Sequence, residues 1–207
     1  MISLDQIIKA TKSSPSDIVA IYPYGSRVYG TASETSDYDF IVVAKNLPRD
    51  QGSDQFSANN VNINIYSQVH FQKQLDEHKI ASLECYFLPQ DLILLEKERL
   101  KWNYNKSELR SSISMKSDHS FVKAKKKMII AKDFDPYIAK KSLFHSLRIL
   151  TFGIQIATYK KIVNYQEANH YWHELVNCNQ TDWDFYKEKY QPEFNKLKSV
   201  FREKALK

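Results

Sequence analysis

Two short apolar segments, joined by a turn and a polar loop, most constrain how this chain can fold. Ile18–Tyr22 is a continuous apolar run, and Phe40–Val43 is a second one. Short runs without a polar face are typical of strands that are buried on both sides. Between them, Gly25-Ser26 begins a turn into a short helix, and Asp37-Tyr38-Asp39 opens the second strand. The sequence therefore predicts two carboxylates at the start of a buried strand.

The spacing of the two aspartates indicates a particular chemistry. Side chains alternate along a strand, so Asp37 and Asp39 are expected on one face and Tyr38 on the other. Two adjacent carboxylates repel each other unless a cation lies between them, and a hard ion such as Mg²⁺ prefers oxygen ligands that it shares with substrate phosphates. The segment therefore predicts Asp37 and Asp39 as ligands of Mg²⁺ or Mn²⁺. The alternative is a solvated strand start after a serine-rich loop.

The Gly25-Ser26 turn is the second candidate element. The free N–H groups and the dipole of a helix N-terminus attract phosphate, glycine lets the backbone come close, and Ser26 adds a hydroxyl donor. Two of the four glycines of the chain, Gly25 and Gly30, fall within this one segment. A plain helix-entry turn with Ser26 as its N-cap is the alternative. The downstream aspartate pair favours phosphate binding.

The remaining patterns predict an α+β protein. Val61–Tyr66 alternates strictly and predicts a third strand with one apolar face. Residues 45–59 are polar and predict a loop. Helices are expected at 2–12, 71–78, 121–132, 138–159, 165–177 and 183–204. The predicted architecture is a small mixed β-sheet core in residues 1–98, followed by a basic helical bundle in residues 99–207.

Charge is distributed unevenly between these two halves. Residues 1–98 carry 8 Lys and Arg against 13 Asp and Glu, a net charge of −5, whereas residues 99–207 carry 22 against 11, a net charge of +11. This asymmetry suits a metal site in the first half and a polyanion-binding surface in the second. An ordinary solvated helix surface is the alternative. The candidates for contact with a nucleic-acid backbone are Lys123, Lys125, Lys126 and Lys127.

Cysteine usage and hydropathy bear on the compartment. Cys85 and Cys178 are far apart and lack metal-type spacing, so a disulfide scaffold is not expected. The N-terminal segment lacks the features of a signal peptide, and no apolar segment approaches the roughly 20 residues that a membrane helix needs. We expect a cytoplasmic protein without a membrane partner. The sequence leaves the oligomeric state open.

The order of these motifs resembles the DNA polymerase beta-like nucleotidyltransferase superfamily. Within it, the chain is similar to bacterial and phage predicted nucleotidyltransferases, some of which are associated with RNA ligases. In the first half, the resemblance covers roughly residues 18–90. The motifs that carry it are Gly25-Ser26-Arg27 with Gly30, Ser36-Asp37-Tyr38-Asp39, Val61-Asn62-Ile63 with Tyr66-Ser67, and Lys141-x-x-x-His145-x-x-Arg148.

The resemblance implies a metal-dependent enzyme that moves a nucleotide from a nucleoside triphosphate to a hydroxyl acceptor. RNA is the favoured acceptor because the second half is basic, and a protein or a small molecule is an alternative. The residues it assigns to nucleotide binding are Gly25, Ser26, Arg27, Lys141, His145 and Arg148. The latter three share one helix face, where a polar stripe covering the first half is the alternative.

One position departs from the superfamily pattern. A third carboxylate is usual on the third strand, and the motif alignment puts Asn62 there. An asparagine can ligate through its carbonyl oxygen, but it brings no charge and is a poor base. Three explanations are open: the enzyme works with two acids, Glu84 or another carboxylate takes the missing place, or the protein is a binding module that has lost catalysis.

Overall fold

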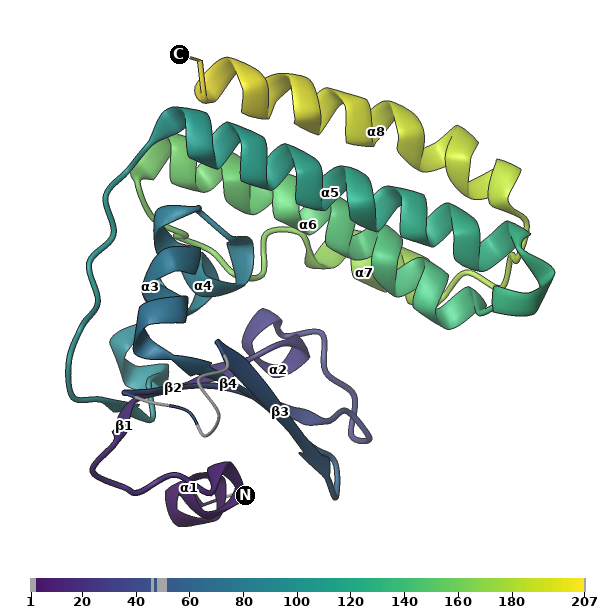
Figure 1. Ribbon diagram of the computed structural model, residues 1–207. Coiled ribbons are helices and arrows are strands. Elements are labelled where there is room, and N and C mark those ends of the chain that lie inside the picture. The colour runs from purple at the N-terminus through teal and green to yellow at the C-terminus, as the bar shows by residue number, and fades with distance from the viewer. Residues whose placement is uncertain (1–2, 46, 48–51, 207) are drawn as a thin grey trace. The chain divides into compact units, whose positions relative to one another are not determined.

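The computed structural model describes residues 3–45, 47 and 52–206. The chain divides into two compact units, Met1–Asn103 and Tyr104–Lys207, and each is described by itself (Figure 1). Residue 2 of the first predicted helix, and residues 46 and 48–51 of the predicted loop, lie outside the described residues.

A mixed five-stranded sheet forms the centre of the first unit, in the order β3-β4-β2-β1-β5. Its strands are β1 (Ile18–Tyr24), β2 (Tyr38–Ala44), β3 (Ser53–Ala58), β4 (Val61–Ser67) and β5 (Leu95–Glu96). β2 pairs with β4 in parallel, and all other pairs are antiparallel. The two apolar runs of the sequence are the neighbouring strands β1 and β2 near the middle of the sheet, which is why neither has a polar face.

Helices cover both faces of this sheet (Figure 1). α1 (Leu4–Thr11) begins with a capping box between Ser3 and Gln6 and packs Ile7 against Phe40, Val42, Ile63 and Ile65. The opposite face carries α3 (Gln68–Asp76) and α4 (Ile80–Tyr86), which are followed by the 3-10 helix η2 (Gln90–Leu92). Since side chains alternate, the even-numbered β4 residues point away from α1.

The edge strand β3 corrects the prediction of a loop over residues 45–59. Ser53–Ala58 is polar and almost entirely exposed, so its sequence lacks the apolar alternation by which a strand is recognised. β3 forms a hairpin with β4 in which Ala58 pairs with Val61. The two connecting residues, Asn59 and Asn60, have φ angles of 50° and 60°. A two-residue turn with both φ angles positive matches the twist of a hairpin, and asparagine tolerates it.

The second unit consists of helices: α5 (Lys106–Ile129), the 3-10 helix η3 (Ala131–Asp133), α6 (Pro136–Tyr159), α7 (Asn169–Val176) and α8 (Trp183–Lys204). α5, α6 and α8 run alongside one another (Figure 1). α6 is the most buried of them because it packs against the other three helices. A Cβ atom on Gly153 of α6 would lie 2.7 Å from Ile113 and 3.0 Å from Phe201, so the missing side chain permits the close approach of α5 and α8.

α5 is longer than predicted, because it begins at Lys106 rather than at residue 121. Asn105 caps it by accepting hydrogen bonds from the N–H groups of Ser107 and Glu108. Its first half is rich in serine, and the buried Leu109, Ser112 and Ile113 pack there despite weak apolar periodicity. Within residues 3–45, 47 and 52–206, no helix is long and apolar enough to cross a membrane.

The hairpin turn generates a first prediction. We expect Asn60→Val to lower the free energy of unfolding by about 1–2 kcal/mol, because a β-branched residue is strained at positive φ. Asn60→Gly is the matched control and should keep or slightly raise stability. Urea denaturation followed by circular dichroism measures both. Equal stability of the two variants would contradict the turn geometry.

Candidate functional site

The end of β1 and the start of β2 bring the Gly25-Ser26 turn against the second aspartate. Tyr24 pairs with Asp39 in the antiparallel register of β1 and β2. Gly25 follows with φ 80° and ψ −153°, a conformation that only glycine adopts readily. A Cβ atom at this position would lie 2.4 Å from Asp39 Oδ2. Glycine is therefore required both by the backbone and by the space that the Asp39 carboxylate occupies.

The side chain of Asn62 joins the two carboxylates. Asn62 is the register partner of Asp39 in the parallel pairing of β2 and β4. Its Nδ2 atom donates hydrogen bonds of 3.1 Å to Asp37 Oδ2 and of 3.1 Å to Asp39 Oδ1. One nitrogen thus reaches both carboxylates, which shows that their oxygens converge on a common point. Asp37 is exposed and immediately precedes β2, and Asp39 is half-buried.

Ser57 completes this row across the sheet. It pairs with Asn62 in the register of the β3–β4 hairpin, and its hydroxyl donates a 2.6 Å hydrogen bond to Asn62 Oδ1. Both ends of the Asn62 amide are therefore held, one by the aspartates and the other by Ser57. Sequence reasoning missed Ser57 because it lies on the unpredicted strand β3.

Arg27 holds the backbone that carries the aspartates. Its guanidinium donates to the carbonyl oxygens of Ser36 at 2.6 Å and Asp37 at 3.2 Å, and it lies 3.8 Å from the centre of the Tyr38 ring. Tyr38 packs against the core on the α1 side of the sheet, opposite to Asp39, as the alternation predicts. These contacts direct the Arg27 side chain to the loop before β2. Its predicted role in nucleotide binding stays a prediction.

The short helix α2 (Ser26–Tyr29) is anchored through its buried residue Tyr29. Tyr29 is buried, packs edge-on against Tyr24, and donates a 2.6 Å hydrogen bond to Glu84 Oε2 on α4. Glu84 is itself only 2% exposed. Within the described part of the chain, no three His, Cys, Asp or Glu side chains form a group suited to a metal ion. Through its hydrogen bond with Tyr29, Glu84 positions α2, and its alternative role as the third carboxylate stays a prediction.

The charges of four basic side chains of the helical unit act on His145. Arg148 is 3% exposed, and its Nε donates a 3.4 Å hydrogen bond to His145 Nδ1. Burial, and then the charges of Arg148, Lys141, Lys123 and Lys116, hold the pKa of His145 well below its usual value of 6.5. A neutral imidazole that accepts at Nδ1 agrees with this direction.

This cluster, which we call the His145 cluster, contains Lys116, Lys123, Lys141, His145 and Arg148. The charge of Lys123, predicted for nucleic-acid contact, thus acts on His145, one of the three residues predicted for nucleotide contact. Lys116 is a member that sequence reasoning missed, although its spacing of seven residues from Lys123 on α5 is a helical signal.

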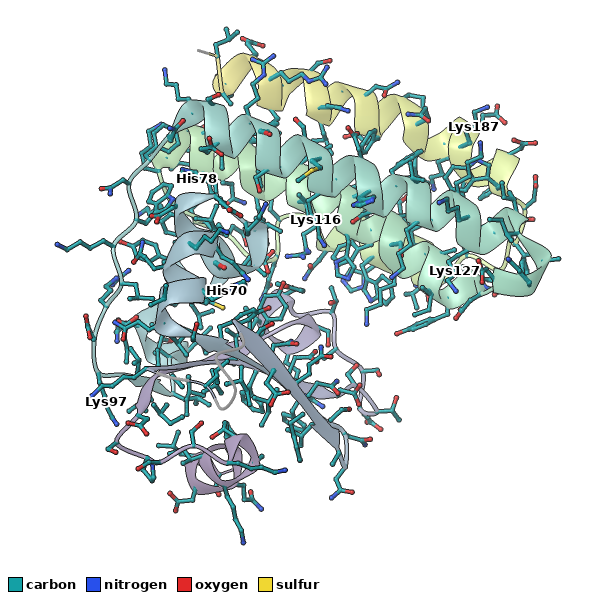
Figure 2. All side chains as sticks on the ribbon, in the orientation of Figure 1. His70, His78, Lys97, Lys116, Lys127 and Lys187 are labelled. Carbon is teal, nitrogen blue, oxygen red and sulfur yellow. The ribbon has the colours of Figure 1, made fainter. Side chains whose placement is uncertain are left out.

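Figure 2 labels Lys116 and Lys127 on α5. Lys125 and Lys126 are exposed, and Lys126 and Lys127 lie in the last turn, where cations favour the helix dipole.

The fold and the site together define the class of the protein. The sheet, with a Gly-Ser turn opposite an Asp-x-Asp strand and followed by a helical unit, is the arrangement expected of a nucleotidyltransferase. The nucleotidyltransferase domain family matches residues 4–115, and the chain belongs to this family. The predictions of the superfamily and of an α+β fold are confirmed.

Comparison with solved structures agrees at the level of the fold. A spectinomycin adenyltransferase from Enterococcus faecialis, crystallised with ATP and spectinomycin, is 12% identical, with 96% of this chain and 98% of that chain covered and a TM-score of 0.50. A nucleotidyltransferase-like protein from Exiguobacterium sibiricum is 14% identical over 96% of this chain and 74% of that chain. Its TM-score of 0.31 supports no structural conclusion. No curated protein matches the chain.

The geometry of Gly25 generates a second prediction. We expect Gly25→Ala to cost about 1–3 kcal/mol of unfolding free energy, because its backbone conformation is strained for other residues and the new methyl group displaces Asp39. Gly30 has φ 75° and ψ 25°, in the left-handed helical region, and Gly30→Ala should cost only about 1 kcal/mol. Denaturant titration measures the two variants. A larger loss at Gly30 would contradict the close approach of Gly25 and Asp39.

The lowered pKa of His145 generates a third prediction. The unfolded chain binds a proton at this histidine more readily than the folded chain does, so acid favours unfolding. The free energy of unfolding should fall as the pH drops below about 6.5. His145→Gln should reduce the slope of that free energy against pH by the equivalent of up to about one bound proton. His119→Gln, at an exposed position on α5, is the control. Melting temperatures between pH 5 and pH 8 provide the measurement, and an unchanged slope in His145→Gln would contradict it.

Proposed function

We propose that this protein is a divalent-metal-dependent nucleotidyltransferase that moves a nucleotide from a nucleoside triphosphate to a hydroxyl acceptor. The observation that carries the proposal is the convergence of Asp37, Asp39 and Asn62 beside Gly25. Family membership supports nucleotide transfer, and the convergent oxygens support the metal dependence.

The donor set fits Mg²⁺ or Mn²⁺. Two carboxylates that share one hydrogen-bond donor can share one small cation instead, and their oxygens are the ligands that Mg²⁺ prefers. With Asp37 and Asp39 as the acid ligands, waters and substrate phosphates would supply most other ligands, which is usual for Mg²⁺ sites. When bound, the ion would polarise the phosphate and neutralise developing charge.

Each residue then has a role in the transfer. Gly25 and Ser26 hold the phosphates with backbone N–H groups and a hydroxyl, and Arg27 fixes the loop that carries Asp37. An acceptor hydroxyl attacks the α-phosphorus, an oxygen–phosphorus bond forms, and pyrophosphate leaves. Asp37 and Asp39 are the bases available to take the hydroxyl proton. Lys141, His145 and Arg148 of the helical unit are the candidates for contact with the triphosphate or the base, since Lys141 and Arg148 are cations and the imidazole of His145 forms hydrogen bonds.

We propose RNA as the acceptor. The helical unit presents exposed Lys123, Lys125 and Lys126 on one helix, and phosphate-neutralising cations account for most sequence-independent RNA binding. Lys127, half-buried in the last turn of that helix, belongs to the same proposed surface. Proteins and small molecules are other acceptors to test, and the solved adenyltransferase makes spectinomycin one defined probe. The expected location in the cytoplasm suits an RNA substrate and stays a prediction.

A second candidate function is a nucleotide- or RNA-binding module without catalysis. The observation that favours it is the neutral Asn62 amide, which already satisfies both aspartates. Such a protein would bind a nucleotide but transfer nothing.

Transfer of label separates the two functions. We expect the full chain, incubated with α-labelled triphosphates, Mg²⁺ or Mn²⁺ and a mixed RNA pool, to label RNA. Asp39→Asn should lower the rate by about a hundredfold or more, because it removes a charge that acts at the reacting phosphate.

Asp54→Asn provides the matched control, since Asp54 is an exposed aspartate on β3 and its loss should leave the rate unchanged. Spectinomycin and the protein itself are tested as acceptors in the same assay. Nucleotide binding in equilibrium dialysis without label on any acceptor would favour the binding module.

A further inference from the structure

We propose that Asn62 is a two-state ligand of the metal site, and that Ser57 is the residue that positions it in both states. In the state seen here, the amide N–H₂ group bridges the two aspartates. In the metal-bound state, the amide is turned over, so that its carbonyl oxygen faces the cation. This inference rests on the proposed function, since it assigns two residues to the cation site of that function.

The sheet registers place these side chains in one row. Asp39 of β2, Asn62 of β4 and Ser57 of β3 are successive register partners and point away from the α1 side of the sheet. The tight Asn59-Asn60 turn holds Ser57 opposite Asn62. The row is therefore a property of the backbone pairing, and it persists whichever way the amide faces.

The two ends of the amide explain how one residue serves both states. An asparagine side chain has a donor end and an acceptor end, and a serine hydroxyl both donates and accepts. Ser57 now donates to Asn62 Oδ1. After a turn of about 180° around the Cβ–Cγ bond, which is a soft torsion, Ser57 accepts from Nδ2 and Oδ1 takes the place between the aspartates. No hydrogen bond is lost at Ser57.

Charge explains why a neutral residue suits this position. Without a cation, the Asn62 amide offsets the repulsion between Asp37 and Asp39, because its Nδ2 donates at 3.1 Å to one oxygen of each. An aspartate in the same place would add a third carboxylate to the two and raise that repulsion. Asn62 therefore stabilises the metal-free site. Compared with an aspartate, it offers the cation one negative charge fewer.

Binding of Mn²⁺ to the full chain, followed by the electron paramagnetic resonance signal of free Mn²⁺, tests this proposal. We expect Asn62→Ala to raise the Kd about tenfold and Ser57→Ala to raise it by a smaller factor. Asn62→Asp, which keeps the ligand oxygen and adds charge, should lower the Kd. It should also lower the melting temperature without metal and gain more from saturating Mn²⁺ than the wild type gains.

The same strands offer a matched control. Gln55 and Asn64 form an equivalent pair two residues along the hairpin, where Gln55 Nε2 donates to Asn64 Oδ1 at 2.7 Å. Asn64→Ala and Gln55→Ala should leave the Kd for Mn²⁺ unchanged. Circular dichroism confirms that each variant is folded.

The sign of the Asn62→Ala effect decides the outcome. If the amide only bridged the aspartates without metal, its removal would free them and lower the Kd. A lowered or unchanged Kd, with Mn²⁺ binding still lost in Asp39→Asn, would overturn the proposal and leave the proposed function standing. If Asn62→Ala raises the Kd for Mn²⁺ but the wild type transfers no nucleotide to any acceptor, the result would support the proposal and contradict the proposed function.

Discussion

The pairing of β2, β4 and β3 is the constraint on which the candidate site depends. The parallel register sets Asn62 beside Asp39, and the antiparallel hairpin sets Ser57 beside Asn62. A shift of one residue in either pairing would turn these side chains to the other face. The buried Ile63 and Ile65 oppose such a shift, because it would move both side chains out of the core that they form with α1. Hydrophobic packing on one face thus fixes the polar row on the other.

Electrostatics distinguishes this site from a simple carboxylate cluster. Asp37 and Asp39 converge on the amide of Asn62, and Glu84 is directed to Tyr29 on α2. The site therefore has two negative charges and a neutral group that can present either a donor or an acceptor. The Arg27 guanidinium donates to backbone carbonyl oxygens and lies over the Tyr38 ring, so that it holds the loop that carries the carboxylates.

The helical unit gathers the opposite charge. Lys116 and Lys123 lie on α5, and Lys141, His145 and Arg148 lie on α6. The two helices pack closely, so that cations of both helices act on His145. Burial first, and then these neighbouring cations, lower the pKa of His145, since protonation would add another cation to this group. A concentration of positive charge around a neutral imidazole is suited to an anionic ligand such as a phosphate chain.

The amino-acid sequence by itself determined the local features of the protein. Apolar runs specify β1 and β2, strict alternation specifies β4, and the positions of Gly25, Asp37 and Asp39 specify the turn and the carboxylate pair, since each depends on residues close along the chain. Tertiary structure alone decided the rest. β3 is polar and forms only because β4 offers hydrogen bonds, and the serine-rich start of α5 is stabilised by packing. Ser57 joins the aspartates through strand register, and Lys116 acts on His145 across the packing of α5 and α6. Both depend on contacts between residues that are distant in sequence, whereas the spacing of Lys116 and Lys123 shows only that they share a helix face.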